Sequence, residues 1–142
     1  MQQHPILFAI RYVNIQFDKE ANNILKPYDL SVSQYKVLLY LYHRPPFTVR
    51  QVDIERYYNI TNPTVTGILH SLEKKGLIER KTNPDDERSK VISLTPRAYV
   101  MQDDLTELGS QLESILTHSL TDDEREQLRV LLTKMMENME SR

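Results

Sequence analysis

The chain has 142 residues, 39% hydrophobic and 27% charged, which is typical of one globular domain, and its net charge of −2 reflects an excess of acid in residues 96–142. It contains no cysteine, which excludes disulfides, thiolate metal sites and a thiol-based redox switch. We expect a cytoplasmic protein without a membrane partner, because no apolar run approaches the ~20 residues of a membrane span and the N-terminus lacks an apolar signal segment.

The first helix is predicted from apolar residues that recur at helical spacing from Ile6 to Leu25. The pattern stops at Lys26, because the following Pro27 disfavours helix in the residue before it. Ser31 or Ser33 can cap a second helix, which ends before two consecutive prolines at 45 and 46.

A third helix is expected to begin at Thr48, because Thr48 and Gln51 have the spacing of a capping box, and to continue to about Tyr58. The next helix follows after a short turn. Thr61 or Asn62 can cap it, Pro63 suits its first turn, and Gly76 ends it. Two helices joined in this way form a helix-turn-helix.

This fourth helix has two different faces. Val65, Ile68, Leu69 and Leu72 lie at spacings of three, four and seven residues and form a buried face. The opposite face carries small and hydrogen-bonding side chains that could enter a major groove: Asn62, Pro63, Thr64, Thr66, Gly67, His70 and Lys74.

Two β-compatible runs, residues 77–82 and 89–94, follow and predict a hairpin with a charged turn at 83–88. Arg88 would lie in that turn among acidic residues. A cation there can enter a narrow minor groove, and Asp85 and Asp86 could orient its guanidinium. The alternative is a solvated loop whose charges cancel locally.

Two more helices are expected at the C-terminal end. Thr95 and Pro96 can start the first, which carries apolar residues from Met101 to Leu116. Thr121 and Glu124 form a capping box that opens the second, and its apolar residues include a methionine cluster more typical of interface packing than of a ligand site. These helices exceed what a small winged domain can cover, which suggests a partner.

The order of helix, strand, charged turn and strand in residues 61–95 resembles the DNA-binding half of the MarR (multiple antibiotic resistance regulator) family. The matching segments are ITNPTVT at 60–66, LEKKGLI at 72–78, and PDDERSK at 84–90 followed by Leu94 and Thr95. Many family members have a basic residue where this chain has Gly67, and another where it has Glu87. The resemblance implies a fold of mainly α-helices with a small β wing, and terminal helices that interlock two subunits.

Other chemistries find little support. No nucleophile elbow, phosphate-binding glycine loop or zinc-protease helix is present, so we expect no catalytic residues and no cofactor. The four histidines are far apart in sequence, so we expect no metal site. Tyr12, Tyr35 and Tyr42 could line a pocket for a small aromatic effector, which the resemblance implies for some members. Core and boundary positions are the alternative for these tyrosines.

The sequence therefore predicts a single MarR-like unit, with a winged helix-turn-helix in residues 30–95 and helical dimerisation segments in 1–29 and 96–142. We expect a homodimeric repressor that binds double-stranded DNA at a pseudo-palindromic operator. Lys75, Lys81 and Lys90 are expected, with Lys74, to contact phosphates. The alternative is a winged-helix module that binds another protein.

Overall fold

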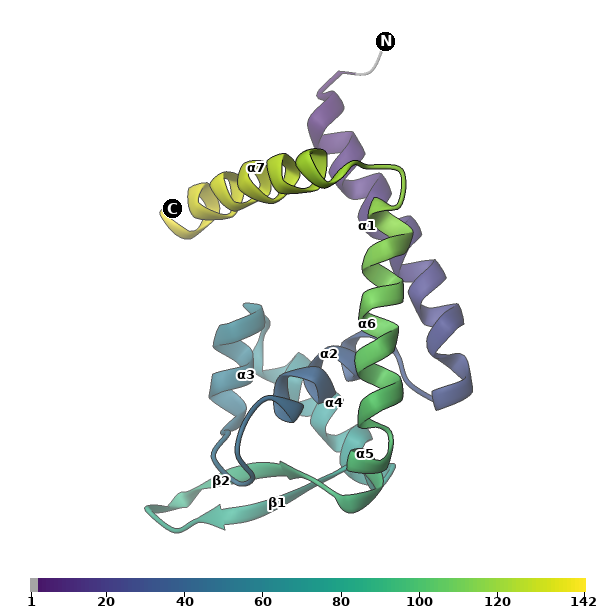
Figure 1. Cartoon of the computed structure of the whole chain (residues 1–142). Coiled ribbons are helices and arrows are strands. Elements are labelled where there is room, and N and C mark those ends of the chain that lie inside the picture. Colours follow the sequence, from purple (N-terminus) through teal and green to yellow (C-terminus); the bar gives the residue numbers. More distant parts are fainter. Residues whose placement is uncertain (1–2) are drawn as a thin grey trace. The chain divides into compact units, whose positions relative to one another are not determined.

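The computed structural model describes residues 3–142 and is mainly helical with one two-stranded antiparallel sheet, so the predicted fold class is confirmed. The elements are α1 (Pro5–Leu25), the 3-10 helix η1 (Lys26–Tyr28), α2 (Val32–Tyr42), α3 (Gln51–Tyr58), α4 (Asn62–Lys74), β1 (Ile78–Asn83), β2 (Asp86–Leu94), α5 (Pro96–Val100), α6 (Gln102–Thr117) and α7 (Asp122–Glu140) (Figure 1). Two compact units are present, one up to Glu107 and one from Leu108 onward, and α6 begins in the first and ends in the second.

Local capping signals define several helix ends, and of the two candidate caps for the second helix, Ser31 and Ser33, the structure uses Ser31. Ser31 accepts a hydrogen bond from the backbone of Gln34, whose side chain accepts one from the backbone of Ser31, so this capping box starts α2. At the other end of the helix-turn-helix, Gly76 has a φ of 74°, and the amides of Gly76 and Leu77 donate to the carbonyls of Glu73 and Leu72. This Schellman motif ends α4.

The core of the first unit lies where α2, α3 and α4 meet the hairpin. Leu38, Ile54, Leu69, Leu72 and Ile92 are fully buried there. Each contributes about 1.5–3 kcal/mol relative to an exposed side chain, so this cluster accounts for much of what holds the helix-turn-helix against the sheet.

The hairpin is longer and its turn shorter than predicted. The turn contains only Pro84 and Asp85, rather than all of residues 83–88, and β2 begins at Asp86. The register passes from Thr82 opposite Lys90 to Asn83 opposite Asp86, so three residues of β2 bulge out between these pairs. Figure 1 shows the hairpin extending from its base near α5 to this free turn.

The prediction that Thr48 caps the third helix is wrong. Arg50 is the N-cap, and its amide donates to the Asp53 carboxylate at 2.8 Å, while the Thr48 hydroxyl donates to the carbonyl of Pro45. Val49 forms a bridge with Ile92 of the wing, and the amide of Ile92 donates to the carbonyl of Val49 at 2.8 Å. This long-range pairing keeps the chain extended, so α3 starts at Gln51.

The predicted helix after Thr95 is interrupted. Thr95 accepts a bond from the amide of Ala98 and starts α5, but this helix ends at Val100, and α6 begins at Gln102. Met101 lies in the short turn between them, where its amide donates to Ala98.

In the second unit, the predicted capping box of Thr121 and Glu124 starts α7 as expected. Every residue from Thr121 to Leu132 is exposed. Part of the apolar series from Met101 to Leu116, which was expected to need a partner, is buried within the single chain: Leu105, Leu108 and Leu112. Most of the apolar side chains left exposed on the terminal helices are in α1, in α7 and at the end of α6: Ile6, Leu7, Phe8, Ile10, Val13, Ile15, Ile115, Leu116, Leu128, Val130, Leu131, Leu132, Met135, Met136 and Met139.

Candidate nucleic-acid interface

The predicted groove face of α4 is exposed along its whole length. Asn62, Pro63, Thr64, Thr66, Gly67, His70 and Lys74 are all exposed, whereas Val65, Leu69 and Leu72 are fully buried on the other side. A Cβ added at Gly67 would meet nothing within 4 Å, so the helix backbone is uncovered at this point. The face is small and polar, which suits the floor of a major groove.

Two candidate base-reading side chains are held from the neighbouring helix α3. The amide of Asn62 donates to the Glu55 carboxylate at 3.0 Å. The amide of Gln51 donates to the hydroxyl of Thr66 at 2.8 Å and to the carbonyl of Asn62 at 3.3 Å. These bonds restrict the side chains of Asn62 and Thr66 before any ligand arrives, which reduces the entropy lost on binding.

Arg88 lies in the bulge of β2, with 94% of its side chain exposed. Its backbone amide donates to Asp86 Oδ1 at 3.0 Å, and its Nε lies 3.5 Å from the same oxygen. The sequence suggested that both Asp85 and Asp86 orient the guanidinium, but the structure has one contact, with Asp86. Asp86 is therefore the acid that contacts the guanidinium, while Asp85 lies in the turn, where its amide donates to Asn83.

The two other wing lysines are exposed on facing strands. Lys81 pairs with Val91, and Lys90 pairs with Thr82, so the two basic residues are close in register. The ammonium of Lys81 lies 4.2 Å from the centroid of the Phe47 ring, a cation–π contact that leaves the lysine exposed.

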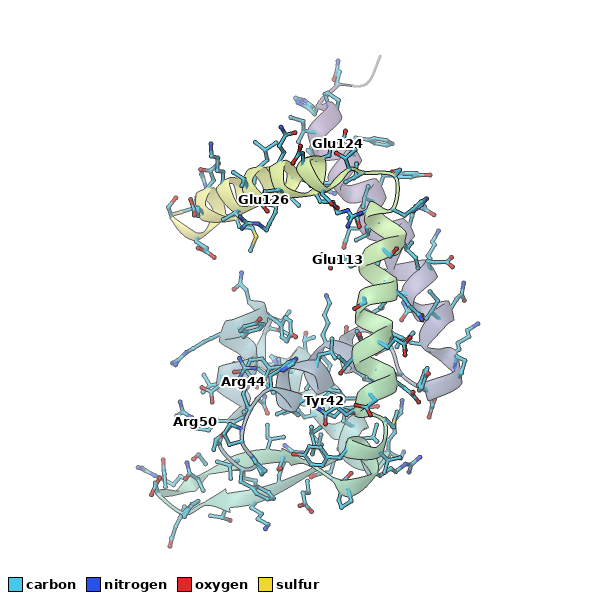
Figure 2. All side chains as sticks on the ribbon, in the orientation of Figure 1. Tyr42, Arg44, Arg50, Glu113, Glu124 and Glu126 are labelled. Atoms are coloured by element: carbon cyan, nitrogen blue, oxygen red, sulfur yellow. The ribbon has the colours of Figure 1, made fainter. Side chains whose placement is uncertain are left out.

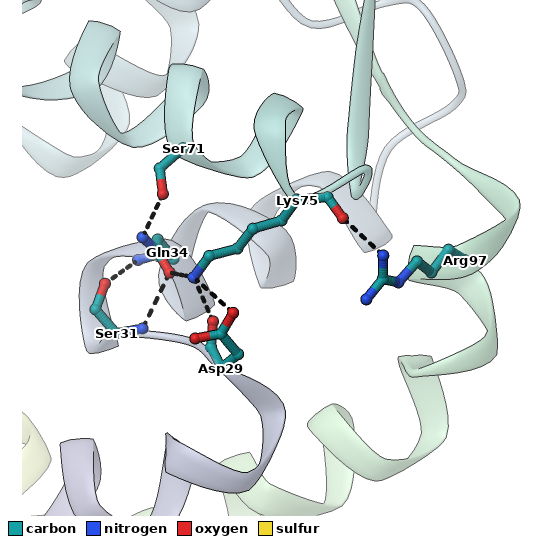
Figure 3. A network of polar contacts seen from close by, with 6 residues as sticks. All are labelled: Asp29, Ser31, Gln34, Ser71, Lys75 and Arg97. Atoms are coloured by element: carbon teal, nitrogen blue, oxygen red, sulfur yellow. Dashed lines mark hydrogen bonds and ion pairs between the residues drawn. The ribbon is translucent and has the colours of Figure 1, made fainter.

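Lys75 has a different environment from the one predicted. Its ammonium donates to the backbone carbonyl of Asp29 and, at 2.9 Å, to Oε1 of Gln34, and only 25% of its side chain is exposed. Its proton donors are thus directed into the protein (Figure 3). The geometry does not support the predicted phosphate contact for this lysine.

The prediction from the sequence missed Arg80, which joins the wing to α4, the predicted groove helix. Its guanidinium donates to both carboxylate oxygens of Glu73, at 3.1 Å and 3.3 Å. The hydrogen bonds from Arg80 hold the pKa of the Glu73 carboxyl below its usual value. The partners come from α4 and β1, so helical spacing alone gave no signal for this pair.

A second feature that the sequence did not indicate is the stacked guanidinium of Arg44, which follows α2. Its central carbon lies 3.4 Å from the centroid of the Tyr40 ring and 5.4 Å from that of Tyr57, and one of its nitrogens donates to the carbonyl of Tyr40. Figure 2 shows Arg44 and Arg50 at the loop between α2 and α3. The cation–π contacts join α2 to α3 and support the first helix of the helix-turn-helix.

The tyrosines considered for an effector pocket each have a separate structural partner. Tyr35 is buried and donates to the carbonyl of Leu105, and Tyr42 is buried and donates to the carbonyl of Ala98. Burial raises the pKa of Tyr35, and it raises that of Tyr42 to about 12. Tyr12 is exposed on α1 and stacks with Phe8. Tyr35 and Tyr42 are therefore core residues, and their hydroxyls donate to backbone carbonyls.

Membrane spans and metal clusters are both absent from residues 3–142. Within this range no helix is long and apolar enough to cross a membrane, and no group of three or more His, Asp or Glu side chains could hold a metal ion.

The model of the MarR family matches residues 30–90, which contain α2, α3, α4 and most of the hairpin. The multiple antibiotic resistance protein MarR of Salmonella typhimurium is 33% identical over 133 residues, which cover 93% of this chain and 91% of that protein. The chain belongs to the MarR family. The corresponding protein of Escherichia coli is 31% identical over 133 residues and is covered to the same extent.

Solved structures of other MarR-family proteins share the fold over nearly the whole length. Staphylococcus aureus MepR in complex with DNA has a TM-score of 0.87 and 30% identity, covering 97% of this chain and 99% of that one. A mutant of E. coli MarR in complex with operator DNA has a TM-score of 0.84 and 29% identity, covering 93% of this chain and 94% of that one. The family is one of transcription regulators, in which the winged helix-turn-helix is the shared feature.

Proposed function

We propose that this protein is a homodimeric transcription regulator, most simply a repressor, that binds double-stranded DNA through residues 30–95. The observation that carries the proposal is the exposed polar face of α4, supported by α3 and flanked by a wing with an exposed arginine. The similar MepR and MarR structures that contain DNA support the same use of this surface.

In this proposal each part of the interface has a role. α4 enters the major groove, where Asn62, Thr64, Thr66 and His70 face base edges. Arg88 enters the adjacent minor groove, whose negative potential attracts a guanidinium. Lys74, Lys81 and Lys90 contact phosphates, which position the protein without reading sequence.

We infer a second subunit from the exposed apolar side chains of the terminal helices, residues 1–29 and 96–142. Ile6, Leu131 and Met136 expose 69%, 56% and 60% of their surface in the single chain. Exposed apolar side chains of this number and size are costly in water, and a second copy of the chain covers them in a symmetric dimer. Such a dimer presents two α4 helices to successive major grooves, about 34 Å apart.

The salt dependence of binding to duplex DNA tests the proposal. With Lys74, Lys81 and Lys90 of both protomers on phosphates, six counterions are released, so log K should fall with log salt with a slope of about −5. Selection from fragmented genomic DNA should then yield one pseudo-palindromic site. Binding with a slope near zero would refute the DNA contacts and favour a protein partner.

A regulator of transcription acts where the chromosome is, so we place the protein in the cytoplasm. We propose no catalytic activity, because the exposed site offers hydrogen bonds and positive charge rather than a nucleophile and a base. A small aromatic effector that releases the operator remains part of the proposal, but Tyr35 and Tyr42 are not its pocket, since both are buried and hydrogen-bonded to the backbone. Equilibrium dialysis with salicylate as the probe tests the effector separately.

A further inference from the structure

A polar cluster joins the C-terminal end of the groove helix to the start of α2 (Figure 3). Lys75 is the C-cap residue of α4, and its ammonium donates to the carbonyl of Asp29 and to Gln34 Oε1 at 2.9 Å. The Asp29 carboxylate lies 3.8 Å away. Gln34 also donates from its amide nitrogen to the hydroxyl of Ser71, one turn earlier in α4, at 2.9 Å. Two residues of α4 are therefore held by one side chain of α2.

The same cluster continues to α1. Asp29 follows η1 with a left-handed backbone, φ 55°, and its amide donates to the carbonyl of Lys26. The amide of Val32, the first residue of α2, donates to the side chain of Asn22 in α1 at 3.0 Å. Hydrogen bonds thus connect the end of α1, the start of α2 and the end of α4.

The backbone of Lys75 is also hydrogen-bonded, to a residue of α5. Its carbonyl, which a helix end leaves without an intrahelical partner, accepts a bond from the guanidinium of Arg97 in α5 at 3.0 Å. The next carbonyl, that of Gly76, accepts a bond from the Thr95 hydroxyl at 2.6 Å. Lys75 therefore contacts both segments that lead to the terminal helices, one through its side chain and one through its carbonyl.

We propose that Lys75 is a positioning residue for DNA recognition, which fixes the orientation of α4 relative to α1 and α5 instead of contacting a phosphate. This inference rests on the proposed function, because only a DNA-binding dimer needs its two groove helices at a set separation. Two of the three ammonium protons are donated to acceptors of the protein itself, and the Asp29 carboxylate 3.8 Å away adds an ion pair on the same side. The neighbouring Lys74 is exposed, in contrast to the partly buried Lys75.

A measurement without DNA tests the positioning directly. The natural chain has no cysteine, so Asn23→Cys in α1 and Gly67→Cys in α4 introduce two spin labels at exposed positions. Labelled chain mixed with excess unlabelled chain reports the distance within one protomer. We expect a single narrow distribution for the parent and a broadened or shifted one for Lys75→Met.

Matched variants separate loss of the contacts between Lys75 and Gln34 from a general loss of stability. Lys36→Met removes an exposed lysine of α2 and should leave the distribution unchanged. Gln34→Met removes the acceptor of the Lys75 ammonium and should broaden the distribution. Gln34→Glu retains an acceptor for Lys75 and for the backbone of Ser31, and its carboxylate can accept from the Ser71 hydroxyl in place of donating to it, so it should preserve the parent width. An unchanged distribution in both Lys75→Met and Gln34→Met would overturn the proposal.

Binding to operators with varied half-site spacing gives the functional readout. Lys75→Met should lose the preference for one spacing, weaken binding at that spacing about tenfold, as expected for one charge-assisted hydrogen bond, and keep the salt slope. Lys81→Met should instead reduce the slope by about 0.9 for each phosphate that the lysine no longer neutralises, and should keep the spacing preference. A reduced slope with unchanged label distances in Lys75→Met would show that Lys75 contacts a phosphate. Failure of the parent to bind DNA would refute the proposed function. The label distances would still show whether Lys75 fixes the orientation of α4.

Discussion

Leu131 of α7 offers the sharpest test of the dimer, because it is exposed in the single chain. It exposes 56% of its surface, so burial in an interface would remove about half of a leucine side chain from water, worth about 1 kcal/mol. A symmetric dimer gains this twice, about 2 kcal/mol, which corresponds to roughly a 30-fold change in the dimer dissociation constant. Leu131→Glu also places two carboxylates in the interface at a further cost of several kcal/mol, so we expect dimerisation to weaken roughly 1000-fold or more.

Sedimentation velocity over a range of concentrations measures this effect, with circular dichroism as the check on folding. Thr82→Glu adds the same charge at an exposed position of β1 and should remain dimeric. The thermal midpoint of the parent should rise with protein concentration, since the dimer unfolds to separated chains. A helical Leu131→Glu variant that sediments as a dimer over the same concentrations as the parent would refute the assignment of α7 to the interface.

Arg88→Ala should weaken operator binding at least about tenfold, as expected for loss of a charged contact, and should change folding stability by no more than about 0.5 kcal/mol, because 94% of its side chain is exposed. Fluorescence anisotropy and thermal unfolding measure the two effects, and equal affinity of variant and parent would exclude the arginine from the interface. Thr66→Ala should alter base preference at one half-site position, whereas Lys81→Ala should weaken all sequences about equally; a single-substitution operator series compares them, and an unchanged preference in Thr66→Ala would contradict a reading role. Gln51→Leu should alter the same position as Thr66→Ala, because Gln51 holds that hydroxyl, and the double variant should show less than the sum of the two effects. Independent, additive effects would count against the coupling.

The sequence predicted the helices whose ends are set by local chemistry. The Thr121 capping box and the glycine at 76 each depend on backbone groups within about one turn, so their residue types suffice to locate them. For α2 the sequence left Ser31 and Ser33 as alternative caps, and the structure uses Ser31. Thr48 has the same local pattern, yet α3 starts later because Val49 bridges to Ile92. A pairing between residues so far apart in the chain leaves no trace in a capping pattern.

The hairpin shows a second limit to what the sequence could predict. Residues 83–88 are polar and charged, so a period of two with a buried face cannot be seen there, and the sequence suggested a long turn. The structure extends both strands to a two-residue turn, and the outer part of the hairpin is exposed, so it has no buried face that would impose alternation on the sequence. Arg88 is exposed as predicted, but in a bulge of β2 rather than in the turn.

The sequence predicted the outline of the candidate site but not the contacts within it. The periodicity of α4 separates a buried face from an exposed one, and the structure has the predicted groove residues on the exposed face. It could not show that Lys75 turns inward to Gln34, or that Arg80 pairs with Glu73. Long flexible side chains reach partners that only the folded chain brings near, so their roles depend on tertiary structure.

The contacts from α3 also affect which base edges α4 can read. Since the Thr66 oxygen accepts a hydrogen bond from Gln51, its hydroxyl proton is free to donate outward, toward acceptors such as a purine N7, guanine O6 or thymine O4. Asn62 uses one amide proton on Glu55 and keeps its oxygen and its second proton, the pair of groups that adenine requires. The first helix of the helix-turn-helix thus sets the hydrogen-bonding polarity of the second. Base preference should therefore depend on Gln51 and Glu55 as well as on the side chains that face the groove.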